Sequence, residues 1–114
     1  MEAKNTFVEI ELETGEVVRA TLTFYYLLQL KNKHKKVYER YNKIITNGAA
    51  DEFDNITVMY TGYLCAFLAD NGDIEDAMSE DEFISALSPD REYLTECVTM
   101  LLAPKKARAS AARS

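Results

Sequence analysis

Glycine, histidine and cysteine are scarce in this sequence, and tryptophan is absent. Its 114 residues include four Gly, one His and two Cys. Loops that cradle phosphate depend on closely spaced glycines, and the sequence contains no such loop. It also has no metal-spaced set of Cys and His and no nucleophile elbow. These absences leave no catalytic site that the sequence supports, and they favour a binding protein.

Long hydrophobic runs are also missing. No apolar stretch approaches the ~20 residues that a membrane-spanning helix needs. The first residues, MEAKNTFVEIELE, are charged and alternating, unlike a secretory signal peptide. Cys65 and Cys97 are far apart, and each lies in a predicted helix with apolar neighbours. We therefore expect a cytoplasmic protein with reduced, buried thiols, no disulfide and no membrane partner.

Acidic charge, by contrast, is plentiful. The formal net charge is -6, although the last ten residues are basic and contain no acidic or large apolar side chain. The basic side chains of this tail are Lys105, Lys106, Arg108 and Arg113. We expect one globular domain over residues 1–104 and a flexible basic tail over residues 105–114. Because the body is strongly acidic, we do not expect it to bind nucleic acid.

The segment FVEIELETGEVVRATLTF predicts a β-hairpin. Val8, Ile10 and Leu12 share one face of its first strand, with glutamates on the other. On the return strand the apolar face comprises Val18, Ala20 and Leu22, and the opposite face comprises Val17, Arg19, Thr21 and Thr23. Gly15 supplies the positive φ that the turn requires. Since an isolated hairpin is marginally stable, it must pack on helices or on another subunit.

From Phe24 the apolar spacing changes to three and four residues, which predicts a helix capped by Thr23 and ended at Gly48. Leu27, Leu30, His34, Val37, Tyr41 and Ile44 form its apolar stripe, widened by Leu28, Tyr38 and Ile45. A second helix is expected from Asp51 or Asn55 to Ala69. Its stripe comprises Phe53, Ile56, Tyr60, Leu64, Phe67 and Leu68. Gly62 in its middle indicates close helix packing.

Two further helices are predicted towards the end of the chain. Ser79 and Glu82 have the spacing of a capping box, and this short helix should end near Leu87. Ser88 is expected to cap the last helix, with Pro89 at its first position. The fold class is therefore α+β: an N-terminal β-hairpin followed by a mainly α-helical body of about four helices.

The acidic segment DNGDIEDAMSED, residues 70–81, raises two hypotheses. The first is calcium binding, but Gly72, Ile74 and Glu75 stand where an EF-hand loop has two ligands and its glycine. We favour a solvated loop before a capped helix, and we expect no metal site. The second hypothesis is mimicry of DNA, which makes the protein a small acidic adaptor or inhibitor of a DNA-binding protein.

The single histidine and the tyrosines have chemical and structural interpretations. His34 is a candidate general base or metal ligand, and spacing does not exclude a dyad with either cysteine. Nothing around these residues resembles a site, so we interpret His34 as structural and predict no catalytic or cofactor-binding residue. The seven tyrosines, next to KNKHKK at 31–36, are a candidate base-stacking platform. Tyr38, Tyr41 and Tyr60 fall on core stripes, however, which favours core packing.

The order of these parts resembles the tail assembly chaperones of long-tailed (siphophage-type) bacteriophages. The resemblance extends from FVEIELETGEVVRATLTFYYLLQLKN through NITVMYTGYLCAFL and MSEDEFISAL to TECVTMLLAPKK. Members are small, acidic and poor in catalytic motifs, and their hairpin runs directly into a helix. The resemblance implies a self-associating, non-catalytic protein without cofactors. Such a chaperone binds the helical tape measure protein and keeps it soluble in the host cytoplasm, and it is absent from the mature virion.

The basic tail has two explanations. In many members of the family a translational frameshift adds a second domain, which resembles a recruiter of the tail tube protein. Codons for Lys105 and Lys106, within PKK at 104–106, suit such a slippery site. Alternatively, the tail is simply solvated, and its charge contacts acidic neighbours in an oligomer. The basic tail and the basic first helix both depart from what the resemblance requires.

Exposed apolar and aromatic side chains are the expected means of association. We predict that Phe24, Tyr25 and Tyr26, at the junction of hairpin and helix, contact the partner or a second copy. Phe83 and Ile84, on the third predicted helix, complete this predicted surface.

Overall fold

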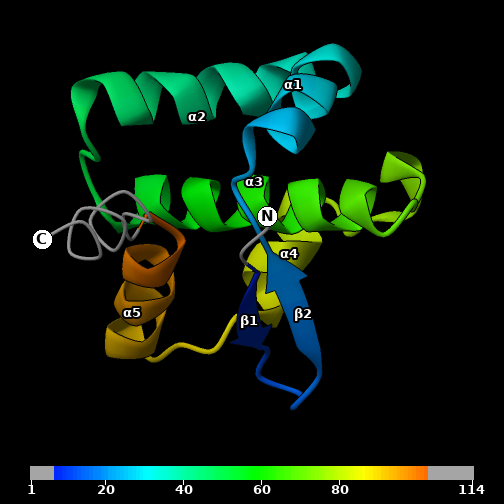
Figure 1. The fold of residues 1–114 in the computed structure, drawn as a ribbon. Helices are drawn as coiled ribbons and strands as arrows, with labels where there is room; N and C mark the ends of the chain where they lie inside the picture. Colours follow the sequence, from blue (N-terminus) through cyan, green and yellow to red (C-terminus); the bar gives the residue numbers. More distant parts are fainter. Residues whose placement is uncertain (1–6, 103–114) are drawn as a thin grey trace, which may run out of the picture.

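The computed structural model describes residues 7–102, which pack around one long central helix. The elements are β1 (Val8–Glu11), β2 (Val17–Ala20), α1 (Phe24–Lys33), α2 (Lys35–Asn47), α3 (Glu52–Ala69), the 3₁₀ turn η1 (Ile74–Asp76), α4 (Glu80–Ala86) and α5 (Arg91–Leu102). Helices α1 and α2 lie on one side of α3, and the hairpin, α4 and α5 lie on the other (Figure 1). The α+β class is confirmed; Pro104 and the predicted tail lie outside the described residues.

The hairpin forms as expected and packs on helices. Its strands are antiparallel, with Ile10 opposite Val18, and Gly15 has a φ of +94°. Val8, Ile10 and Leu12 are buried, as predicted. Thr21, predicted on the solvated face, is buried instead. Its backbone N–H donates to the Gly62 carbonyl at 3.0 Å, because the chain leaves β2 directly against α3.

Helix α3 is buried on all sides rather than along one stripe. Asp51 caps its start by accepting hydrogen bonds from the N–H groups of Phe53 and Asp54. Every residue from 56 to 66 is buried, whereas Phe53, predicted on the buried stripe, is exposed. The sequence does carry a signal for this outcome, since no charged residue occurs between Asp54 and Asp70. A helix that is apolar all round belongs in a core.

Gly62 lies at the closest approach in the core. A Cβ atom there would be 3.1 Å from the Cβ of Ala20 on β2 and 3.4 Å from Cδ2 of Leu101 on α5. Close packing at Gly62 is thus confirmed, and it involves a strand as well as a helix.

The single helix predicted after the hairpin is two helices. His34 leaves helical geometry, with φ -146° and ψ 69°, between α1 and α2. The backbone there still forms hydrogen bonds, from His34 N–H to the Leu30 carbonyl and from Tyr38 N–H to the His34 carbonyl. The break allows buried residues of both helices to pack against α3. It explains why residues 7–102 contain five α-helices instead of about four. No Pro or Gly marks it.

Helix ends mostly follow local sequence signals. Gly48 has a φ of +89°, and the capping box of Ser79 and Glu82 is present, both as predicted. The start of α1 differs, because the Thr23 side chain makes no capping bond to the helix; its hydroxyl lies 2.9 Å from that of Thr21. The start of α5 also differs. This helix begins at Arg91 rather than at Pro89.

Helix α5 starts later than predicted because the side chains of Ser88 and Asp90 form hydrogen bonds with backbone N–H groups at its start. The Ser88 hydroxyl accepts a hydrogen bond from Asp90 N–H, and the Asp90 carboxylate accepts one from Tyr93 N–H. Asp90 therefore supplies the cap that was assigned to Ser88.

Candidate protein-binding surface

Helix α1 presents an apolar face to solvent, formed by Phe24, Tyr25 and Leu28 and called here the α1 face. These side chains are 87%, 60% and 56% exposed. Leu27 and Leu30, on the opposite side of α1, are buried in the core. The helical period therefore places Phe24, Tyr25 and Leu28 outwards. Exposed apolar groups gathered on one helix are typical of a binding surface.

Not every predicted interface residue lies at the surface. Phe24 and Tyr25 are exposed, as expected, and Tyr26 is half-buried with its ring 5.0 Å from that of Tyr25. The prediction for Phe83 is wrong, because this residue is fully buried and its ring packs against those of Tyr60 and Tyr63 on α3.

Ile84, next to Phe83, is 37% exposed, as expected for a surface residue. Leu28 is also exposed, although the sequence analysis placed it on the buried stripe. Its position four residues after Phe24 was the signal for its place on the outer face.

A groove of about 330 Å³ lies where the start of α3 meets α4 and α5, and we call it the α4–α5 groove. It is lined by Glu52, Asn55, Ile56, Ile84, Leu87, Ser88, Pro89, Arg91, Leu94 and Thr95. Half of these residues are apolar, and two of the lining residues, Glu52 and Arg91, form an ion pair of 3.0 Å. Of these residues, the sequence analysis predicted only Ile84 at a binding surface. The groove is formed by three elements that are separate in the sequence, so no local pattern indicates it.

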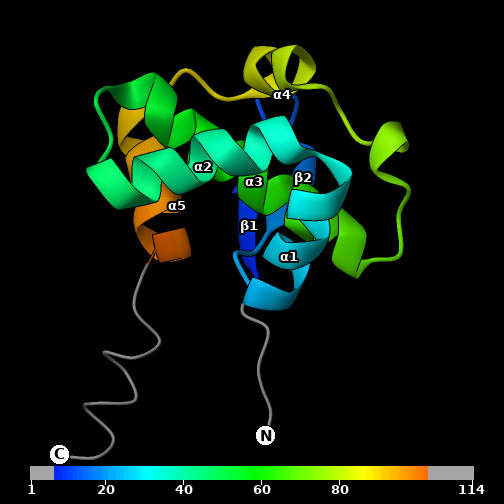
Figure 2. The same cartoon turned by 90° about the horizontal axis from the view of Figure 1, so that it is seen from above.

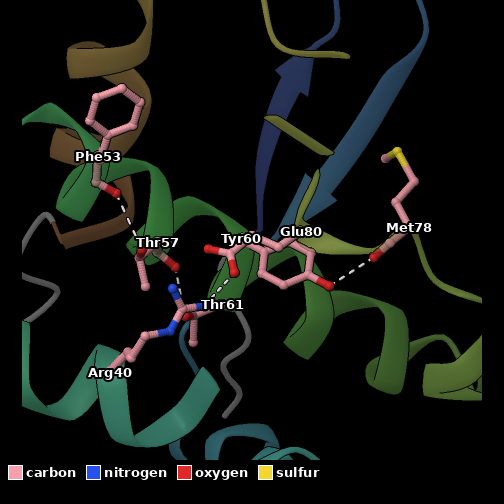
Figure 3. Close-up of polar contacts among 7 residues, drawn as sticks. All are labelled: Arg40, Phe53, Thr57, Tyr60, Thr61, Met78 and Glu80. Carbon is pink, nitrogen blue, oxygen red and sulfur yellow. Dashed lines mark hydrogen bonds and ion pairs between the residues drawn. The ribbon is translucent and has the colours of Figure 1, made fainter. Parts of the chain in front are cut away.

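The start of α4 is fastened to α2 and α3 by polar contacts (Figure 3). The Tyr60 hydroxyl donates to the Met78 carbonyl at 2.8 Å, and the Met78 N–H donates to the Tyr63 hydroxyl at 2.9 Å. Arg40 of α2 pairs with Glu80 of α4 at 2.5 Å. These contacts fix the position of α4, and with it one wall of the groove.

Buried threonines of α3 are satisfied within the helix. The Thr57 hydroxyl donates to the Phe53 carbonyl and the Thr61 hydroxyl to the Thr57 carbonyl, as Figure 3 shows. These side chains therefore do not serve as donors to a ligand.

The two cysteines are free, fully buried thiols, which confirms their predicted environment. Burial raises the pKa of Cys65 to about 12, and burial also raises the pKa of Cys97. Such thiols are neutral at physiological pH and poorly suited to nucleophilic attack. His34 is half-buried beside a hollow lined in part by Val37, Arg40 and Tyr60, and neither cysteine lines that hollow.

Several acidic residues of the 70–82 segment have structural partners. Asp70 pairs with Arg19, and Glu80 pairs with Arg40. Asp73 accepts a hydrogen bond from Glu75 N–H at the start of η1, and Glu82 belongs to the capping box. Their roles in the fold account for these four acids without reference to a DNA-mimicking surface.

Within residues 7–102, no group of three or more His, Cys, Asp or Glu side chains is arranged to hold a metal ion. None of the described helices is both long and apolar enough to cross a membrane. Comparison with protein-family models, with curated proteins and with solved structures finds no match to this chain.

Proposed function

We propose that this protein is a non-catalytic chaperone that binds an extended helical partner through the α1 face and also binds itself. The observation that carries the proposal is the exposure of Phe24, Tyr25 and Leu28 together on one face of a single short helix. An apolar stripe of a partner helix can cover such a face by packing helix against helix. The partner implied by the sequence resemblance is the tape measure protein of a long-tailed phage.

The chemistry of the α1 face suits transient binding. Three apolar side chains give a small contact, so one subunit binds the partner with modest affinity. Many subunits bound along one extended partner together give stable binding. A chaperone that must later be displaced by tail tube subunits needs this balance.

The direct test is co-expression with the tape measure protein of the same phage. The chaperone should raise the soluble fraction of that protein and co-purify with it. The double variant Phe24→Ser, Leu28→Ser should lose both effects. Ile45→Ser is the matched control, because Ile45 is a 47% exposed apolar side chain on α2, outside the α1 face. A tape measure protein that stays insoluble, or a double variant that protects it as well as the parent chain does, would contradict the proposal.

The same proposal extends to the life cycle of the protein. It works in the host cytoplasm and is absent from the finished virion, and a longer frameshifted product recruits the tail tube protein. Mass spectrometry of purified virions tests the first point. The nucleotide sequence at the codons of Lys105 and Lys106 tests the second, because without a heptameric slippery site there the frameshift idea fails.

A further inference from the structure

Four lysines follow the α1 face directly, and we call them the lysine cluster. They are Lys31 and Lys33 in the last turn of α1 and Lys35 and Lys36 in the first turn of α2. All four side chains are exposed, and no acidic residue occurs from 24 to 38. Figure 2 looks down on α1 and α2, which form the layer nearest the viewer. The α1 face and the lysine cluster therefore belong to the same outer layer of the molecule.

The charge of the lysine cluster is hardly compensated within the fold. Among residues 7–102, its one ion pair joins Lys35 to Glu39 at 3.9 Å, and both side chains are largely exposed. An exposed pair of this kind contributes little to stability. The Lys31 ammonium lies 5.7 Å from the centre of the Tyr38 ring, which is a weak cation–π contact. The cluster is therefore available to bind negative charge from outside the fold.

Helix stability does not explain the position of the lysine cluster. Lys31 and Lys33 suit the last turn of α1, where a helix favours positive charge. Lys35 and Lys36, however, stand in the first turn of α2, where a helix favours acids, and this turn contains none. The four like charges also repel one another. A role in binding a negatively charged partner accounts for the cluster instead.

We infer that the helix bound by the α1 face is amphipathic and acidic, with carboxylates about one to two turns beyond its apolar stripe. The stripe covers Phe24, Tyr25 and Leu28, and the carboxylates pair with the lysine cluster. This spacing follows from the chain, because the cluster begins three residues after Leu28 and ends eight residues after it. The inference rests on the proposed function and names the chemistry of the partner helix.

A single helix fits this surface better than an anionic bilayer or a nucleic acid does. Residues 31–36 hold four of the eight Lys and Arg residues between positions 7 and 102, a region with eighteen Asp and Glu residues. A bilayer or a nucleic acid presents negative charge over an area wider than the cluster, so the acidic remainder of the molecule would repel it. One helix brings its carboxylates to the lysine cluster alone, while its apolar stripe covers the α1 face.

The first experiment compares two synthetic helical peptides that differ only in charge. Both carry the same leucine stripe, and beyond it one carries four glutamates and the other carries four lysines at the same positions. Fluorescence anisotropy measures the affinity of each peptide for the parent chain. The acidic peptide should bind at least about tenfold more tightly at low salt. This preference should shrink as salt is added, because exposed charges are screened.

The second experiment reverses charges in the cluster. Lys33→Glu, Lys36→Glu should weaken binding of the acidic peptide by about tenfold, whereas Phe24→Ser, Leu28→Ser should bind neither peptide. Lys36→Glu alone has a matched control in Lys43→Glu, because Lys43 is also exposed and lies seven residues further along the same side of α2. Lys36→Glu should weaken binding by about threefold, and Lys43→Glu should leave it unchanged. Thermal unfolding confirms that each variant is folded.

Three results would overturn the inference. The first is a parent chain that binds both peptides equally or binds neither. The second is an equal loss of affinity in Lys36→Glu and Lys43→Glu, which would reduce the effect to net charge. The third is cosedimentation with phosphatidylserine vesicles that Lys33→Glu, Lys36→Glu abolishes, without any preference for the acidic peptide. That result would assign the surface to a membrane.

The outcome is separable from that of the proposed function. Both double variants are co-expressed with the tape measure protein. If Lys33→Glu, Lys36→Glu protects it as the parent chain does, while Phe24→Ser, Leu28→Ser does not, the inference fails and the chaperone function stands. If the parent chain prefers the acidic peptide through the lysine cluster but never protects the tape measure protein, the partner chemistry stands and the chaperone function fails. Reduced protection in both variants supports both proposals.

Discussion

At the scale of single residues, burial of ionisable groups links the stability of this protein to pH. Cys65 has no exposed surface, and burial raises its pKa from 9.0 to about 12. The pKa values of Tyr41 and Tyr60 rise from 10.0 to about 12, also chiefly through burial. In the unfolded chain these groups ionise near their ordinary values, whereas the folded protein keeps them neutral. The folded state therefore holds more protons than the unfolded state at alkaline pH.

We expect the free energy of unfolding to fall as pH rises from about 9 to about 12. Below about pH 8 these groups are neutral in both states, so their contribution is complete and independent of pH. Urea unfolding at pH 7, 9 and 10.5 measures the loss. Cys65→Ala should reduce the decline between pH 9 and 10, while the tyrosines maintain it above pH 10. An identical pH dependence in the variant and the parent would show that Cys65 does not contribute.

At the scale of elements, local sequence sets most helix boundaries. The glycine at position 48 and the capping box at the start of α4 are readable in sequence because each satisfies backbone groups within a few residues. The end of α3 follows the same logic. Asn71 adopts a φ of +65°, and Gly72 N–H donates to the Phe67 carbonyl in a Schellman arrangement.

The capping box at Ser79 should contribute measurably to stability. Its hydroxyl accepts a hydrogen bond from Glu82 N–H at 3.2 Å, and Ser79 N–H donates to the Glu82 carboxylate at 2.8 Å. Ser79→Ala should lower the free energy of unfolding by about 1 kcal/mol. Ser85→Ala, an exposed change within the same helix, provides the comparison. The measurement is thermal and urea unfolding of both variants and the parent. Equal free energies of unfolding for the parent and Ser79→Ala would show that the cap does not stabilise the protein.

At the scale of the whole molecule, the arrangement around α3 divides apolar side chains into core and surface. Phe83 packs against Tyr60 and Tyr63 in the core, and Phe24 projects from α1 into solvent. The composition and spacing of the sequence do not indicate which of these two phenylalanines is buried and which is exposed. Their roles follow from which elements meet across α3.

This division predicts opposite effects for two equivalent substitutions. Phe83→Ala should cost about 3–5 kcal/mol of stability, because it removes a fully buried ring from a packed core. Phe24→Ala should change stability by no more than about 0.5 kcal/mol, because that ring is largely solvated. Urea unfolding at low protein concentration, where self-association does not contribute, compares the two. Similar losses for both variants would refute this assignment of core and surface.

The sequence by itself determined the hairpin with its turn at Gly15, the α+β class, the caps at Ser79 and Gly48, and the close approach at Gly62. These features depend on side-chain alternation, on capping groups and on backbone freedom over a few residues, so a linear reading reaches them. Only the tertiary structure decided the break at His34 and the places of Thr21 and Phe83. The α4–α5 groove also forms only in the tertiary structure, because its walls come from three separate elements. In each case the deciding energy comes from contacts between residues far apart in the chain, and such contacts leave no local pattern.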